Sequence, residues 1–145
     1  MILRTIIALW SGIICLAVAD PVIAESNAAP GGIKLLPGYQ HEVGRGFDTS
    51  VGTIWKKDVL SIGYDIGELS GNEAGFYGPQ KSSRMAWYKE QYVNGQKVQL
   101  CFMKDRIFHV SVANYANFRA KIESDEALAD MLLMVLTYVG PNGQK

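Results

Sequence analysis

The chain has 145 residues, and its 14 basic and 14 acidic residues give a formal net charge of zero. Because the lysines and arginines are not clustered, the sequence lacks the basic surface that a nucleic acid or an anionic membrane would require. We therefore expect no nucleic acid as a partner. The length suits one domain with a hydrophobic core and is too short for two.

The first 24 residues have the pattern of a secretory signal peptide. Arg4 precedes an apolar run over residues 6–19, and small residues follow where a signal peptidase would cleave. The run is shorter than the ~20 residues that cross a bilayer, so we expect no stable membrane insertion after cleavage. The protein is predicted to be exported, either periplasmic or secreted. Cleavage after Ala24 and cleavage after Ala19 both remain open.

Removal of this segment leaves Cys101 as the remaining cysteine. No intramolecular disulfide can then form, so a hydrophobic core has to stabilise the fold even in an oxidising compartment. Residues 25–32 lack periodicity and contain a proline and two glycines, which predicts a flexible leader. We expect a single α+β domain over residues 33–145.

Strand patterns occupy the middle of that domain. Residues 59–66 alternate apolar with small or polar side chains, and together with residues 51–56 they predict a hairpin with one buried face. Residues 84–114 predict three further antiparallel strands. Asn94-Gly95 marks the first turn of this meander, because Asn-Gly readily adopts the positive φ angles of tight hairpins. Residues 33–50, with several glycines and one proline, are expected to be irregular and partly extended.

The second turn of the meander, at residues 104–106, sets the register of its last two strands. Paired residues share a face of the sheet, so only an odd-length loop places apolar residues opposite one another. A three-residue loop gives the pairs Phe102–Phe108, Leu100–Val110 and Val98–Val112 on a core face. The opposite, mixed face then carries Lys97, Gln99, Cys101, Met103, His109 and Ser111.

A candidate binding surface lies on this mixed face and in the loop before the meander. Residues 67–83 contain four glycines and one proline, and a loop of this length is commonly functional. Aromatic residues with a polar group are favoured at binding surfaces. A two-residue turn at Asn94-Gly95 would place Tyr88 and Tyr92 on the mixed face, whereas a three-residue turn would place them in the core, and both remain open. The candidate partner or ligand surface comprises Phe76, Tyr77, Tyr88, Tyr92, Cys101 and His109.

The last predicted element is a helix that begins after Ser124 and ends at Gly140-Pro141. Ser124 is a suitable N-cap, and Asp125 and Glu126 favour the helix dipole in the first turn. Residues 115–123 before it are a transition, either one helical turn or the end of a strand. The apolar surface of the helix extends beyond one face, so either the N-terminal segment of the domain covers it or it forms a homodimer. The expected inward residues are Leu128, Met131, Leu132, Val135 and Val139.

Two parts of the sequence resemble known proteins. The stretch F-H-V-S-V-A-N-Y-A-N-F (residues 108–118), followed by D-E-A-L-A-D-M-L-L-M-V-L-T-Y (125–138), resembles the last strand and helix of Mog1/PsbP-like proteins. The stretch G-F-D-T-S-V-G-T-I (46–54), followed by L-S-I-G-Y-D-I-G (60–67), is similar to small exported bacterial proteins of no established activity. The resemblance implies an α+β sandwich with an antiparallel sheet of about five strands and a C-terminal helix on one face. It also implies an accessory or interaction protein, and it transfers no functional residues.

Familiar catalytic motifs are absent from the sequence, which contains no G-x-S-x-G, G-x-x-x-x-G-K, H-E-x-x-H or C-x-x-C. Cys101 opposite His109 is geometrically feasible as a nucleophile pair, although a mid-strand cysteine between apolar neighbours is more typical of an apolar filler. We therefore predict a non-enzymatic binding or accessory domain, without a cofactor, whose partner is a protein or small ligand. We assign no catalytic, cofactor-binding or metal-binding residue.

The alternative is a small metal-dependent or acid–base hydrolase, because imidazole and carboxylate groups bind metals and transfer protons. None of the candidate groups has the spacing of a metal-ligand motif, so the fold would have to bring them together. Its candidate residues are His41, Asp48, Asp65, Glu68 and His109.

Overall fold

A computed structural model gives the structure of residues 29–77 and 83–140. In these ranges a short 3₁₀ turn (Pro30–Gly32) precedes the strands and two α-helices. Neither helix is long and apolar enough to cross a membrane. The elements follow in the order β1 (Gln40–Val43), β2 (Ser50–Lys56), β3 (Leu60–Ile66), α1 (Glu73–Tyr77), β4 (Met85–Val93), β5 (Gln96–Met103), β6 (Ile107–Val112), β7 (Ala116–Lys121) and α2 (Asp125–Val135).

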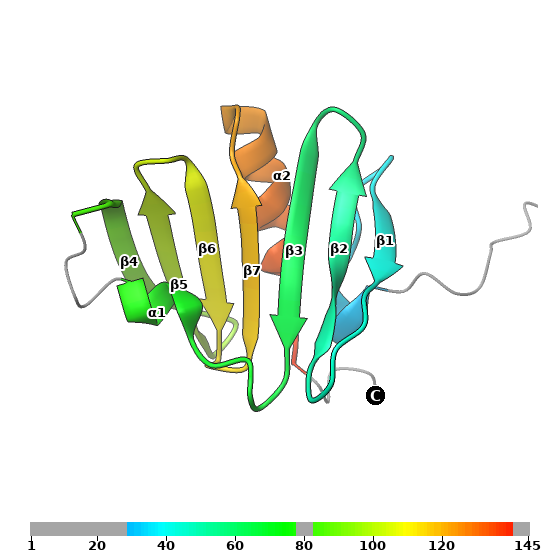
Figure 1. Ribbon diagram of the computed structural model, residues 1–145, viewed down its shortest axis with the longest axis horizontal. Helices are drawn as coiled ribbons and strands as arrows, with labels where there is room; N and C mark the ends of the chain where they lie inside the picture. Colours follow the sequence, from blue (N-terminus) through cyan, green and yellow to red (C-terminus); the bar gives the residue numbers. More distant parts are fainter. Residues whose placement is uncertain (1–28, 78–82, 141–145) are drawn as a thin grey trace, which may run out of the picture.

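The strands form one antiparallel sheet with the order β1-β2-β3-β7-β6-β5-β4. The last strand in the chain, β7, therefore lies in the centre and joins β3 to β6. Figure 1 shows α2 behind the sheet and α1 in front of it, near β5. The α+β class, the antiparallel sheet and the C-terminal helix on one face agree with the prediction.

Among the described residues the sheet has seven strands, more than the predicted number, because β1 and β7 were not expected as strands. β1 is an edge strand in which only His41 is buried, so its sequence shows little of the alternation that reveals a strand. β7 does alternate, but Ala116 and Ala120 are two of its three core-facing residues. Small apolar side chains give a weak hydrophobic signal, which explains why this central strand was missed.

The predicted register of the meander is confirmed. β5 and β6 pair Phe102 with Phe108, Leu100 with Val110 and Val98 with Val112. The first turn has two residues, Asn94 and Gly95, which take positive φ angles of 51° and 77°. This turn places Tyr88 opposite Cys101 and Tyr92 opposite Lys97. The two tyrosines therefore lie on the mixed face, which decides between the two alternatives that the sequence left open.

The face of the sheet toward α2, which we term the core face, carries the main hydrophobic core. Ser124 caps α2 as predicted, since its hydroxyl accepts a hydrogen bond of 3.1 Å from the Ala127 amide. The helix ends at Val135, before the predicted end, because the Thr137 hydroxyl and amide both donate to the Met134 carbonyl. The chain then turns more tightly, so that Tyr138 is buried in the core and Val139 is 48% exposed. The prediction that Val139 faces inward was wrong.

The N-terminal segment covers the end of α2, as the sequence led us to expect. The Val139 amide donates to the Gly31 carbonyl at 2.9 Å, and the Lys34 amide donates to the Thr137 hydroxyl at 2.8 Å. Gly31 is required here, because a Cβ atom would lie 2.1 Å from the Tyr138 ring. Ala29 is also buried, so the ordered domain begins before the predicted boundary at residue 33. The predicted signal peptide (residues 1–24) and residues 25–28 of the leader lie outside the described residues.

Candidate functional site

The other face of the sheet, which we term the outer face, has two different halves. In the covered half, α1 packs over β5 and β6 and closes a small apolar cluster of Ala74, Cys101 and Met103. In the open half, over β2, β3 and β7, Figure 1 shows the strands uncovered by any other described element. The boundary between the halves is where the candidate site lies.

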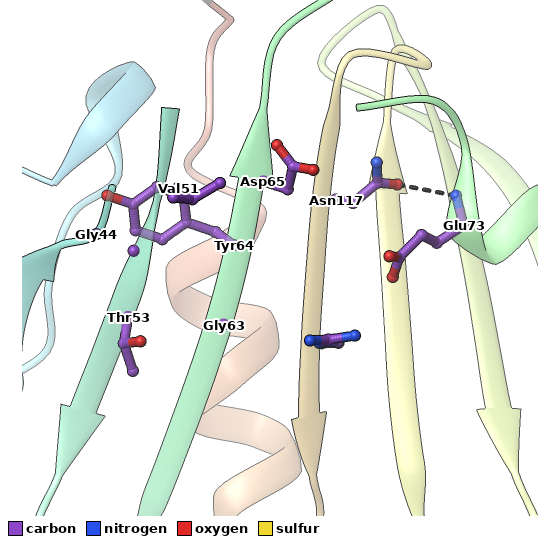
Figure 2. Close-up of a pocket in the computed structure, with 10 residues that line it drawn as sticks. Gly44, Val51, Thr53, Gly63, Tyr64, Asp65, Glu73 and Asn117 are labelled. Carbon is purple, nitrogen blue, oxygen red and sulfur yellow. Dashed lines mark hydrogen bonds between the residues drawn. The ribbon is translucent and has the colours of Figure 1, made fainter. Parts of the chain in front are cut away.

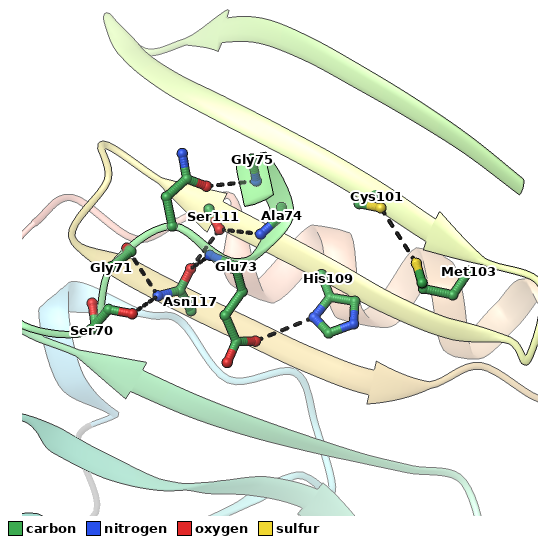
Figure 3. A network of polar contacts seen from close by, with 11 residues as sticks. Ser70, Gly71, Glu73, Ala74, Gly75, Cys101, Met103, His109, Ser111 and Asn117 are labelled. Atoms are coloured by element: carbon green, nitrogen blue, oxygen red, sulfur yellow. Dashed lines mark hydrogen bonds and ion pairs between the residues drawn. The ribbon is translucent and has the colours of Figure 1, made fainter. Parts of the chain in front are cut away.

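Asn117, on β7, holds the loop that leads into α1. Its amide nitrogen donates to the carbonyls of Ser70 at 2.9 Å and Gly71 at 3.1 Å. Its amide oxygen accepts from the Glu73 backbone at 3.0 Å and from the Ser111 hydroxyl at 2.5 Å. Figure 3 shows this network beneath the start of α1. Both donors and both acceptor positions of this buried side chain are used, so the network fixes where α1 begins.

A second group of hydrogen bonds ties α1 to the edge of the sheet. Asn72 accepts from the Gly75 amide at 2.7 Å, and its own amide donates to the Gln99 side chain. Gln99 in turn donates to the Tyr88 hydroxyl at 2.9 Å and to the Glu90 carboxylate at 3.1 Å. Tyr88 is therefore part of the contacts that hold the covered half together.

Glu73 extends from α1 toward the open half. Its carboxylate lies 3.3 Å from Nδ1 of His109. The hydrogen bond from His109 lowers the pKa of the Glu73 carboxyl, burial opposes this shift, and the charges of His109 and Arg119 reinforce it. Glu73 consequently supplies a negative charge at the boundary at neutral pH.

A hollow of about 400 Å³ lies beside Glu73. Figure 2 shows the carboxylates of Asp65 and Glu73 near one end of it, with Gly63 and Thr53 farther along the strands. Gly63 has no side chain to fill the hollow. The Arg119 side chain passes within 3.9 Å of where a Cβ atom of Gly63 would lie. One carboxylate oxygen of Asp65, Oδ1, is buried and has no hydrogen-bond partner in the described structure. The hollow thus combines a cation with two carboxylates, one of which has an unused acceptor.

The hollow continues along β3 as a trough. Gly63 and Arg119 also line a second hollow, of about 280 Å³, which reaches Ser61 and Lys121. Ser61 and Lys121 then line a third, of about 470 Å³, beside Trp55. Because neighbouring hollows share lining residues, we treat them as one depression and term it the trough.

The trough carries two carboxylates at one end, and cations in its middle and at its other end, where Asp58 and Glu123 also line it. The carboxylates of Asp65 and Glu73 lie at one end, Arg119 pairs with Gly63 in the middle, and Lys121 lies at the other end, where it also pairs with Glu123 at 2.7 Å. Asp65 lies four positions after Ser61 along β3, which corresponds to ~13 Å along a strand. This arrangement suits an elongated ligand with a cationic group at one end and an anionic group at the other.

Only part of the predicted surface is accessible. Tyr92 is 74% exposed, whereas Cys101 and His109 are buried beneath α1. These two residues therefore cannot contribute to a partner surface, contrary to expectation, because the glycine-rich loop folds α1 onto them. Burial raises the pKa of the Cys101 thiol, and the thiol contacts the Met103 sulfur at 3.6 Å. This environment is the opposite of one that activates a cysteine nucleophile.

The two aromatic residues predicted to contribute to the surface from the loop lie at the end of α1. Phe76 and Tyr77 are the last residues of α1, and their side chains lie outside the described part of the chain. Residues 78–82, which complete the predicted loop, lie outside it as well.

The five residues proposed for a hydrolase lie in three places. His41 is on the core face of β1, where burial lowers its pKa. Asp65 and His109 lie on the outer face, whereas Asp48 and Glu68 are exposed in loops at one end of the sheet. Within residues 29–77 and 83–140, no group of three His, Cys, Asp or Glu side chains is placed to hold a metal ion.

Glu73, Asn117 and Arg119 contribute most to the boundary site, and none of them was a sequence-based candidate. The alternation of Asn117 and Arg119 with apolar neighbours would have placed both on one face if residues 116–121 had been identified as a strand. Glu73 lies in a glycine-rich loop without periodicity, so no comparable signal marks it.

The fold and site define an α+β domain with one uncovered sheet face. In comparisons with known proteins, no family model matches this chain, and no curated protein or solved structure is significantly similar to it.

Proposed function

We propose that this protein is an exported, non-enzymatic binding or accessory domain whose ligand or partner occupies the trough. The observation that carries this proposal is the continuity of the trough along β3, which places Asp65 and Arg119 beside the same hollow. Asp65 Oδ1 has no hydrogen-bond partner in the described structure, and the Arg119 side chain is exposed. The exposed Arg119 is available to a ligand directly, whereas the buried oxygen of Asp65 contributes an acceptor at the floor of the trough.

The ligand is an elongated polar molecule, such as a peptide segment in an extended conformation. Its cationic end lies near Asp65 and Glu73, and its anionic end lies near Arg119 and Lys121. The wall formed by Thr53 supplies a hydroxyl. Opposite charges at the two ends orient the ligand and reject one with reversed polarity.

Export and family remain parts of the same proposal. Export is supported by the signal-peptide pattern of residues 1–24. A Mog1/PsbP-like architecture is supported by the order of the last elements, in which β6, β7 and a helix across the core face follow one another. An accessory role is consistent with a site built from a sheet face and a docked loop.

The proposal is tested by titrating the isotope-labelled protein with a blocked tetrapeptide that has a lysine at its first position and a glutamate at its last. We expect saturable changes in the NMR signals of the Gly63, Asp65 and Arg119 amides. Blocked tetraglycine is the control ligand, and Arg119→Ala is the control variant, in which the changes should be lost. If the charged peptide perturbs these amides no more than tetraglycine does, the trough is not a site for such a ligand.

A separate measurement addresses the hydrolase alternative. Thermal unfolding is followed with and without Zn²⁺, Mg²⁺ and Ca²⁺, because a metal that binds the folded state raises the unfolding temperature. A rise that disappears in Asp65→Asn or His41→Gln would favour a metal-dependent enzyme over the proposed binding domain.

A further inference from the structure

The loops at one end of the sheet form a second groove that is distinct from the trough. This groove, of about 590 Å³, lies between the β1–β2 loop (residues 44–49) and the β3–α1 turn (residues 67–70). In Figure 1 both loops lie at the lower end of the sheet. The groove shares no lining residue with the trough. We term it the tip groove.

Two large apolar side chains flank the tip groove without being buried. Phe47, from the β1–β2 loop, is 106% exposed, and Leu69, from the β3–α1 turn, is 72% exposed. Both line the same groove. A single exposed apolar residue is ordinary, but two from separate loops at one groove indicate a surface that becomes buried on binding.

Each apolar side chain is next to a carboxylate. Asp48 follows Phe47, Glu68 precedes Leu69, and both acids line the groove. Within residues 29–77 and 83–140 neither acid forms an ion pair. Arg45, in the same loop as Asp48, does not line the groove. The tip groove is therefore apolar and acidic at once.

The β3–α1 turn is held in place before any partner binds. The Gly67 amide and the Ser70 hydroxyl both donate to the Tyr115 carbonyl, at 2.9 Å and 2.7 Å. The Ser70 amide closes the turn by donating to the Gly67 carbonyl at 3.2 Å. A Cβ atom at Gly67 would lie 3.2 Å from Cα of Thr49, so the turn packs closely against the other loop. Such preorganisation reduces the entropy cost of binding.

We propose that the tip groove binds a segment of another protein that presents a lysine or arginine beside a large apolar side chain. The cation pairs with Asp48 and Glu68, while the apolar side chain packs between Phe47 and Leu69. The same two carboxylates repel anionic lipid headgroups. They also repel each other across a symmetric contact between two copies of the groove, so a membrane or a second copy is a poorer occupant.

The test is a selection of random peptides displayed on phage against the full-length protein. Peptides that also bind the double variant Phe47→Ser with Leu69→Ser are removed by counter-selection. We expect the enriched peptides to carry a lysine or arginine next to a large apolar residue. We also expect binding to weaken about tenfold in Asp48→Asn with Glu68→Gln, in line with the loss of complementary charges.

A matched control comes from Val43, which is 69% exposed but does not line the groove. Val43→Ser should leave binding of the enriched peptides unchanged. Because Phe47, Leu69 and Val43 are all exposed, we expect every variant to unfold at the same urea concentration as the parent protein.

Four outcomes would overturn the proposal. One is the absence of any enriched peptide, and another is enrichment of peptides without a cation. A third is binding to phosphatidylglycerol vesicles that Phe47→Ser abolishes, which would assign the groove to a membrane. The fourth is a dimer in sedimentation that the same variant converts to a monomer, which would assign it to self-association.

Discussion

The two halves of the outer face share one sheet but use their polar residues differently. In the covered half and at its boundary on β7, Gln99 and Asn117 form their hydrogen bonds within the protein and hold α1 in place. In the open half, Asp65 keeps a buried oxygen without a partner in the described structure, and Arg119 is exposed. Polar residues in the first half therefore stabilise the fold, whereas we propose that those in the second contact a ligand.

The largest effect is expected for Asn117→Ala. The substitution removes four hydrogen bonds and leaves buried backbone groups of the loop unpaired, each of which costs about 1–3 kcal/mol. We expect the free energy of unfolding to fall by about 3 kcal/mol, measured by urea denaturation. A change as small as that of a surface substitution would show that the network does not hold α1.

A smaller loss is expected for Cys101→Ser, because the hydroxyl enters the apolar cluster under α1. Burying a hydroxyl without a good partner costs about 2 kcal/mol. Cys101→Ala is the control, since it removes the sulfur without adding a polar group, and it should destabilise the protein less. Equal stability of the serine variant and the parent protein would mean that the covered half is not closed to water.

Acid should weaken the contact between α1 and β6. The pKa of Glu73 is lower in the folded protein than its ordinary value of 4.5, so its contribution is fully present above that value and is lost as the pH falls through the folded-state pKa. The pair with His109 is partly exposed, so this contribution is about 0.5 kcal/mol. In Glu73→Gln the free energy of unfolding should depend less on pH below about 5 than it does in the parent protein, because the carboxyl group is absent. Identical pH profiles for the two proteins would contradict this.

The smallest effect on stability is expected for Arg119→Ala. Its exposed side chain is not required by the core, so the free energy of unfolding should change by less than about 0.5 kcal/mol. Peptide binding in the trough should nevertheless be lost. A large destabilisation would remove the distinction between the two halves, because it would show that the fold depends on this cation.

The sequence predicted those parts of the fold where side-chain pattern and turn chemistry agree. Paired apolar residues specified the three-residue loop at residues 104–106, and Ser124 specified the start of α2. The end of α2 was not predictable from Gly140, because Thr137 ends the helix through a side-chain hydrogen bond to Met134. β7 was missed because Ala116 and Ala120, two of its core-facing residues, have small side chains that give a weak hydrophobic signal in the sequence.

The candidate site was harder to predict than the fold. Its chemistry depends on Glu73 and Asn117, which are 44 residues apart in sequence and meet only because the loop folds back onto β7. Cys101 and His109 were correctly placed opposite each other, but nothing in their own strands indicates that α1 would cover them. A face of a sheet can be read from local alternation, whereas its accessibility depends on distant segments.

The central position of β7 also sets the order in which the protein can fold. Ile62 pairs with Ala120, so the middle of the sheet is closed by contacts between residues far apart in the chain, a topology that slows folding. A chain that emerges N-terminus first has β1, β2 and β3 available early, but they gain their inner neighbour only when β7 appears. The sheet therefore remains in two parts until β7 has been synthesised and can join β3 to β6.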